Sequence, residues 1–497
     1  MTMKTKRYNF IKIGILSLLL TSCSDILDEI PDNRTTINSA EKIAELLVGA
    51  YPSGAYAPFL EPMSDNAGDK GPSAQEVRVN EDMFFWRDHN EVGSDTPAFY
   101  WNSAYAAIAQ ANQALVSIEE LGGGIEFDAL KGEALLCRAY THFMLVNIFS
   151  KSYNPNTSNS DLGIPYVLEP ETVLLKDYSR GTVASVYENI QKDLEKGLPL
   201  IEDNYSEPKF HFNKKAANTF ASRFYLIIGE WQKVINHSTV ALGGSGEGSL
   251  RDWENDYRPN TYGEQLLSYS SSNEPANLLL VSAPSTFSRT HASARYQLNG
   301  NKSVEIFPAA NATGKPWSYN VFGSNDLVLN IPKFIEYFRV TNQAANTGFA
   351  YTTFVLFSTD EAILNRAEAY AMLGDFDNAT ADINSSYALK TIGYNATTDV
   401  LSVSDIATLF EVSDTSQFAP FYNVSAETLP FINAVLTIKR TIFYNEGMRW
   451  FDIKRYNMPV EHTDFNGNNY VLTKEDNRRQ VQIPEAAQAF DIEKNPR

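Results

Sequence analysis

The chain has few cysteines for its length. Among 497 residues only Cys23 and Cys137 occur, and one pair cannot build the disulfide framework of a small secreted protein. Cys137 lies within the apolar run "EALLCRAYTHF", which predicts a buried and unreactive thiol. Cys23 follows a different kind of segment, considered below. We therefore expect no stabilising disulfide.

Positive charge is also scarce. There are 41 Lys and Arg against 60 Asp and Glu, giving a formal net charge of −19 at pH 7. Nucleic-acid binding needs clustered basic residues to neutralise phosphates, so that function class is excluded. With 43% hydrophobic and 12% aromatic residues, the composition is that of a folded globular protein. The acidic balance fits a secreted or surface protein kept soluble by self-repulsion.

The sequence lacks the short motifs that hold metals, phosphates or catalytic nucleophiles. Its 6 histidines are scattered, and no HExxH, Cys-x-x-Cys, phosphate loop or G-x-S-x-G pattern occurs. "DFDNATADIN" resembles a calcium loop but lacks the required Gly and final Glu. A glycosidase needs two carboxylates at a set separation, and nothing singles out a pair. We predict no cofactor, no metal site, no catalytic residue and no enzymatic activity.

Long apolar runs are missing except at the N-terminus. Basic residues precede a short apolar stretch at 13–20, and "LTSC" ends at Cys23. This pattern predicts a lipoprotein signal peptide at 1–22, removed so that Cys23 carries the lipid. An ordinary cleaved signal with a chance cysteine is the alternative. We predict that residues 23–36 form a lipidated tether. We expect a protein held on a membrane by its anchor only, because no later segment is apolar enough to span one.

Helical periodicity is what the sequence contains in abundance. Apolar residues recur at helical spacing around 100–150, 183–242 and 358–392, and Thr182 is placed to cap one helix. Turns at 229–230 and 374–375 split two of these blocks into pairs, as in tetratricopeptide repeats. Such pairs bury their apolar faces only by stacking. The predicted fold is mainly α, a tetratricopeptide-like helical repeat superhelix with long loop-rich insertions and a few short strands.

The segment between the second and third blocks differs in composition. Residues 243–325 contain "GGSGEGS", many Ser and Asn, and several Trp and Tyr with weak periodicity. We expect long loops with a few short strands there. Long irregular segments within compact folds are usually functional. We therefore assign 243–355 as a loop-rich segment that faces a ligand.

The stretch "NEGMRWFDIKRY", residues 445–456, concentrates charge. Glu446, Arg449, Asp452 and Arg455 recur every three residues with alternating sign. In a helix they would form a ladder along one face, and partly buried they would fix geometry because unpaired members are costly. No His, Cys or Ser nucleophile accompanies them. We interpret the stretch as a structural fastener.

Several motifs, in this order, resemble those of the SusD/RagB family of outer-membrane lipoproteins. They run nearly end to end, although residues 441–444 and the region near "SSYALKTIGY" depart from the family pattern. The matching stretches are "LTSCSDILDE", "WNSAYAAIAQANQAL", "EALLCRAYTHFMLVNIFSKSYNPNTSNSDLGIPYVLEP", "SRGTVASVYENIQKDLEKGLPLI", "LNRAEAYAMLGDFDNATADIN", "IKRTIFYNEGMRWFDIKRYNMP" and "VQIPEAAQAFDIEKNP". The resemblance implies one SusD-like domain at 37–497, with a C-terminal signature at 436–497.

The resemblance also implies a function. Family members lie on the cell surface, anchored in the outer membrane. They capture oligosaccharides, or in some cases peptides, and close as a lid over a SusC-like TonB-dependent transporter. Two other classes stay open: a surface glycan hydrolase or peptidase, whose catalytic residues the sequence does not supply, and a repeat scaffold that binds only proteins. The aromatic, loop-rich insertion favours small-ligand capture over the scaffold.

Ligand-binding loops of the family correspond by position to residues 65–90 and roughly 285–325. Sugar rings stack on aromatic faces, while amide, guanidinium and carboxylate groups bond their hydroxyls. The alternative for each Trp is a core or subunit-contact role. On this basis we expect ligand contacts from Asp65, Trp86, Arg87, Asn90, Trp317 and Tyr319.

Overall fold

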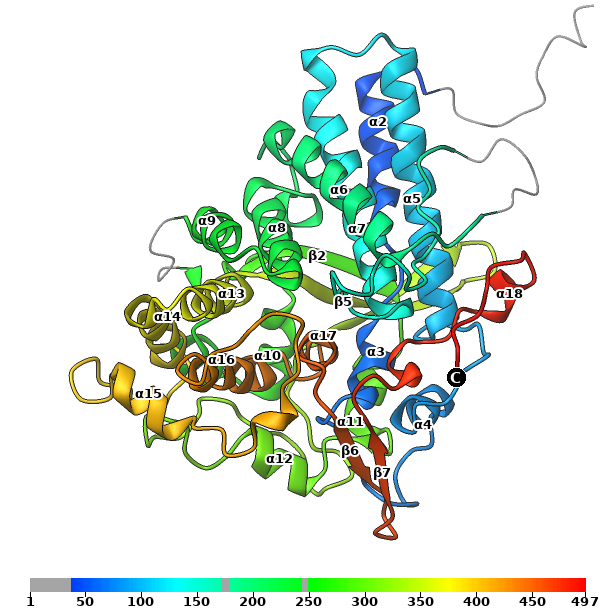
Figure 1. Ribbon diagram of the computed structural model, residues 1–497. Helices are drawn as coiled ribbons and strands as arrows, with labels where there is room; N and C mark the ends of the chain where they lie inside the picture. The colour runs from blue at the N-terminus through cyan, green and yellow to red at the C-terminus, as the bar shows by residue number, and fades with distance from the viewer. Residues whose placement is uncertain (1–36, 171–177, 244–248) are drawn as a thin grey trace, which may run out of the picture. The chain divides into compact units, whose positions relative to one another are not determined.

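Helices stacked in chain order form the main part of the computed structural model, which describes residues 37–170, 178–243 and 249–497. Helix α5 (Pro97–Glu120) packs against α6 (Asp128–Phe149), and α6 packs against α7 (Val183–Gly197). Helix α2 (Ala40–Leu47) lies between α5 and α6 (Figure 1). The series continues through α8 (Lys214–Ile228), α9 (Trp231–Leu242), α13 (Thr359–Met372) and α14 (Phe376–Ala388), each contacting the next. Helices therefore occupy the three blocks in which apolar spacing predicted them.

Local chemistry explains where these helices begin and turn. Thr182 caps α7 by accepting a hydrogen bond from the Ser185 backbone N–H, as predicted. Gly229 and Gly374 follow α8 and α13 with φ of 79° at both positions, a backbone region that glycine enters without a Cβ penalty. The predicted turns of the two helix pairs are present, and they place α9 on α8 and α14 on α13.

A small antiparallel sheet is inserted among the helices. Its strand order is β2 (Asn277–Pro284), β5 (Thr347–Ser358), β4 (Glu336–Asn342). Val281 lies opposite Phe354, and Tyr337 lies opposite Tyr351. Strand β5 leads directly into α13, so the sheet is attached to the third helical block (Figure 1).

The segment predicted as long loops is more ordered than expected. Besides the strands, it contains a π-helix at Trp253–Tyr257 and α10 (Tyr262–Tyr269), α11 (Phe287–Ser293) and α12 (Gly300–Ile306). Trp253 and Tyr257 are fully buried in the main core. Because these rings and the strand residues pack into the helical repeats, the weak periodicity of the segment reflects short elements and not an absence of structure.

The remaining helices and strands complete the described chain. They are η1 (Val48–Ala50), α3 (Ala57–Leu60), η2 (Glu61–Met63), β1 (Gly68–Asp69), α4 (Arg78–Phe84), η3 (Ile125–Phe127), η4 (Leu198–Leu200), η5 (Pro208–Phe210), β3 (Tyr296–Gln297), α15 (Val403–Leu409), η8 (Thr415–Gln417), α16 (Leu429–Ile442), α17 (Met448–Arg455), β6 (Val460–Thr463), β7 (Asn469–Leu472), η9 (Asn477–Arg479) and α18 (Glu485–Gln488).

Residues Ala40–Arg497 form one compact unit. The predicted signal peptide, the lipidation site Cys23 and the tether lie outside the described residues. Within the described residues, every helix is too short or too polar to pass through a bilayer. Cys137 is buried as expected, and burial raises the pKa of its thiol well above the usual value.

The C-terminal signature joins several elements, although not as the predicted ladder. Gly447, at φ 72°, precedes α17, so Glu446 lies outside the helix and bonds Lys333 at 2.7 Å. Arg449 pairs with Asp65, 384 residues away in the chain. Of the four ladder residues, only Asp452 and Arg455 pair along the helix, at 2.8 Å. The stretch binds separate elements together, which supports the interpretation as a fastener.

Candidate functional site

A polar cavity of about 410 Å³ opens where α16 and α17 face α12 and the loop at 410–418. In Figure 1 the labels α16, α17 and α12 all lie in the lower half of the view. Small-molecule sites commonly have volumes of roughly 300–1,000 Å³. Phe418 and Met458 form an apolar part of the cavity wall, and Asp65 is among the polar residues of the wall. The cavity is therefore of a size and chemistry suited to a small polar ligand.

Helix α16 supplies much of the wall through one face. Asn433, Thr437 and Arg440 are spaced four and three residues apart, so they share a side of the helix. Ile438 and Ile442 lie in the buried core instead. The apolar side of α16 packs into the protein, and the polar side is left to the cavity.

Two arginines organise the charges in the wall. Arg449 donates from Nε and Nη2 to the two carboxylate oxygens of Asp65, both at 2.8 Å. Arg440 donates to the Asp65 carbonyl at 2.7 Å and to Glu305 Oε1 at 2.7 Å. Burial by itself would raise the pKa of Asp65, but the positive charges of Arg440 and Arg449 outweigh it and lower the pKa well below the usual range. Asp65 therefore stays ionised and holds both arginines in place.

The ion pair of Asp65 predicts a pH dependence. A depressed carboxyl pKa contributes stability above the unfolded-state pKa of about 4, and this contribution is lost as pH falls below it. In Asp65→Asn we expect the free energy of unfolding to drop by about 1–3 kcal/mol near pH 7, with the difference from the natural protein shrinking toward pH 3. Thermal unfolding across pH measures this, with the exposed Glu427→Gln as control. A difference that persists unchanged at pH 3 would contradict it.

Trp86, predicted to contact ligand, is buried. Its indole Nε1 donates to the Met63 carbonyl at 3.0 Å, and its ring stacks on His462 at 4.5 Å. Its φ of 53° is unusual for a bulky residue, so the packing of the ring is accompanied by a strained backbone. Because both its ring and its N–H are engaged within the protein, Trp86 supports the Met63 segment next to Asp65 and does not offer a free stacking face.

Trp317 and Tyr319 are buried as well, each 7% exposed. Tyr319 packs on Trp253 at 4.1 Å, and Trp317 packs on Tyr387 of α14 at 5.4 Å. Both rings belong to the main core, and another aromatic ring lies against each of them, so little of either ring is open to a ligand; their contact with a sugar stays a prediction. An aromatic residue type alone does not say whether it faces the core or a ligand.

The other three predicted residues, Asp65, Arg87 and Asn90, are at least partly exposed, but they do not all lie at the cavity. Arg87 and Asn90 are exposed after α4, and the Arg87 guanidinium lies over the Phe85 ring at 4.5 Å. Asp65 alone of the six reaches the cavity. The cavity residues of α16 were missed, although polar residues at helical spacing within the apolar run "LPFINAVLTIKRTI" could have indicated them.

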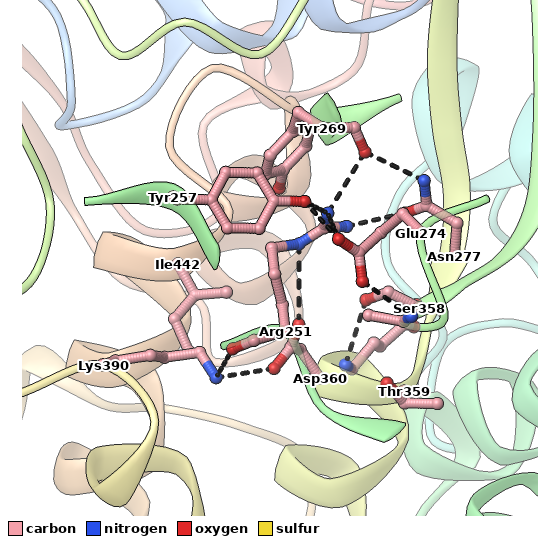
Figure 2. Close-up of polar contacts among 12 residues, drawn as sticks. Arg251, Tyr257, Tyr269, Glu274, Asn277, Ser358, Thr359, Asp360, Lys390 and Ile442 are labelled. Carbon is pink, nitrogen blue, oxygen red and sulfur yellow. Dashed lines mark hydrogen bonds and ion pairs between the residues drawn. The ribbon is translucent and has the colours of Figure 1, made fainter. Parts of the chain in front are cut away.

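A second polar cluster lies inside the protein (Figure 2). Arg251 donates to Tyr257 Oη at 2.7 Å and to Asn277 Oδ1 at 2.6 Å, and Lys390 bonds Asp360 at 2.7 Å. Arg251, Asp360 and Lys390 are each at most 1% exposed. No substrate reaches groups so deeply buried. The cluster instead attaches the π-helix and β2 to α13.

Metal binding finds no support in the described part of the chain. There, no three His, Cys, Asp or Glu side chains gather closely enough to hold an ion. His142 and His291 are buried, and burial lowers their pKa to about 3 and about 4. Each bonds a backbone carbonyl of its own helix. His142 also accepts from the Val167 N–H through Nε2 at 3.1 Å, so both of its ring nitrogens are used within the protein.

Paired helices with glycine turns, and a small sheet and loops inserted among them, define a tetratricopeptide-like repeat protein. The family model described as "SusD family" matches residues 223–494, and one described as "Starch-binding associating with outer membrane" matches 25–226. The chain therefore belongs to the SusD family, whose members are carbohydrate-binding proteins associated with the outer membrane.

Individual relatives are distant but extend over most of the chain. "SusD-like protein P2" of Formosa agariphila is 23% identical over 414 residues, 74% of this chain and 77% of that protein. A SusD superfamily protein from Bacteroides thetaiotaomicron matches with a TM-score of 0.62 and 20% identity, over 92% of this chain and 99% of that one. A SusD-like carbohydrate binding protein from Bacteroides vulgatus matches with a TM-score of 0.62 and 15% identity, over 90% and 96%. The structural matches show a shared fold.

Proposed function

We propose that this protein is a cell-surface lipoprotein, anchored in the outer membrane through Cys23, that captures a nutrient oligosaccharide. It delivers the ligand to a SusC-like TonB-dependent transporter and acts as the lid of that transporter. Support for capture comes from the family and from one observation above all, the cavity of about 410 Å³ beside Asp65. The "LTSC" motif supports the anchor.

We further propose that ligand hydroxyls bond the cavity through Asp65, Asn433, Arg440 and Arg449. Guanidinium, amide and carboxylate groups together supply donors and acceptors, as hydroxyls require. Phe418 offers an apolar contact for a sugar ring. Trp86, Trp317 and Tyr319 act as supports behind the surface.

Arg87 and Asn90 remain proposed contacts for a longer ligand, because both side chains are exposed. They follow α4, which begins 13 residues after Asp65 in the chain. Neither residue lines the cavity, so a ligand that contacts them and the cavity together must extend beyond the cavity.

We propose that the protein binds its ligand without turnover. Isothermal titration of residues 24–497 against oligosaccharides and peptides, with product analysis of the same mixtures, tests this. We expect binding of an oligosaccharide and unchanged ligand. Product formation would overturn the non-enzymatic assignment in favour of a hydrolase. Binding of peptides alone would select the peptide-capturing alternative, and a transporter that co-purifies with a chain binding neither ligand would select a protein-binding scaffold.

A further inference from the structure

The cavity wall carries more negative than positive charge. Asp65, Glu305, Glu411 and Asp414 face two guanidiniums, those of Arg440 and Arg449. The arginines are already engaged: Arg449 is paired with Asp65, and Arg440 with Glu305. Both guanidiniums are therefore already paired with carboxylates of the wall, so neither is an unpaired cation that would attract a negative group on a ligand.

Glu411 and Asp414 lie on the loop at 410–418 that borders the cavity, and both are exposed. In the described part of the chain, no basic group lies within 4 Å of the carboxylate of Glu411 or of Asp414. Two lysines lie outside the wall: Lys302 bonds Glu305 at 2.9 Å, and Lys474 donates to the Ser416 carbonyl. Hydrogen bonds from Ser416 and the charge of Lys474 lower the pKa of Asp414, so this carboxylate stays ionised. The loop side of the cavity therefore presents two exposed carboxylates, and Lys474 offsets part of the charge of Asp414 only.

The wall also offers donors for an uncharged ligand. Arg449 is 7% exposed, and its Nη1 has no acceptor among the hydrogen bonds of the described residues, while Nε and Nη2 are used by Asp65. Asn433 and Thr437 add neutral polar groups beside it. A hydroxyl can accept from such a donor and donate to a carboxylate at once, whereas a sulfate group or the carboxylate group of a uronate can only accept.

We propose that Glu411 and Asp414 make this site selective for uncharged oligosaccharides and exclude sulfated or uronate-bearing ones. This inference rests on the proposed function, since it assigns the ligand class of the same cavity. A negative group brought beside these carboxylates is repelled, and because both carboxylates are exposed, salt screens this repulsion. Specificity then comes from a repulsive element as well as from attractive contacts.

The test uses Glu411→Gln combined with Asp414→Asn, which removes two charges and keeps side-chain size. Asp414 caps η8 by accepting from the Ser416 N–H at 3.0 Å, and Asn preserves that role. The probes are the neutral oligosaccharide that binds best in a panel and the same compound bearing one chemically added sulfate. Glu427→Gln, an exposed carboxylate away from the cavity lining, is the matched control.

We expect the natural protein to bind the neutral probe well and the sulfated probe at least about tenfold more weakly at low salt. The double variant should bind the sulfated probe about three- to tenfold more tightly, with the neutral probe changed by less than about twofold, and high salt should narrow the gain. Equal binding of both probes by the natural protein, or an unchanged ratio in the double variant, would overturn the inference alone. If no oligosaccharide of either kind binds, the proposed function fails and the inference fails with it.

Discussion

Replacing Glu368 by alanine is expected to lower the free energy of unfolding by about 3–5 kcal/mol, because it leaves a buried charge without its main partner. Glu368 is fully buried in α13 and accepts from Arg455 Nη2 at 2.6 Å and from Tyr456 Oη at 2.7 Å. This pair joins the third helical block to the C-terminal signature. Thermal and urea unfolding of the soluble form measure the loss.

A double variant separates the charge from the packing. Glu368→Met together with Arg455→Met replaces both buried charges by apolar side chains of similar length. We expect this variant to recover only part of the stability lost in Glu368→Ala, because Arg455 also pairs with buried Asp452 at 2.8 Å. Without Arg455, Asp452 keeps the longer pair with Lys439, at 3.7 Å. A loss below about 1 kcal/mol in the single variant would show that the pair does not hold these elements together.

Filling the cavity is expected to weaken ligand capture. Thr437 is exposed on the cavity side of α16, so Thr437→Trp places a large ring in the ligand space without disturbing the core. We expect affinity for the bound oligosaccharide to fall at least about tenfold, a loss of 1.4 kcal/mol or more. Stability should change by less than about 0.5 kcal/mol, as for other surface substitutions.

Gln232→Trp is the matched control for that variant. Gln232 is exposed on α9 and does not line the cavity, so the same large ring there should leave affinity unchanged. Equal affinities of Thr437→Trp and the natural protein would place the ligand elsewhere, for example beside Arg87 and Asn90.

The helical part of the fold was predictable because its signals are local. Apolar spacing, the Thr182 cap and the turns at Gly229 and Gly374 each depend on a few neighbouring residues. The family motifs occur in the same order as in the family and extend nearly from end to end, so they predict one domain. The central segment was misjudged because Trp253 and Tyr257 are ordered by contacts with the helical repeats, which leave no local periodicity.

The candidate site was predictable only in part because it is assembled from distant segments. Asp65 and Arg449 are 384 residues apart in sequence, and no local pattern pairs them. Trp86 and Trp317 carry the chemistry of a sugar platform, but burial is set by what the rest of the chain packs against them. Residue type predicted the kind of chemistry, whereas tertiary packing decided which side chains can perform it.

Hydrogen exchange with and without saturating oligosaccharide tests the central claim most directly, because protection reports where the ligand contacts or orders the backbone. If the cavity beside Asp65 captures the ligand, protection will increase at the loop 410–418, along the start of α17 and around Asp65, while the π-helix near Trp253 stays unchanged. Protection confined to other surfaces, with none at these segments, would contradict the account.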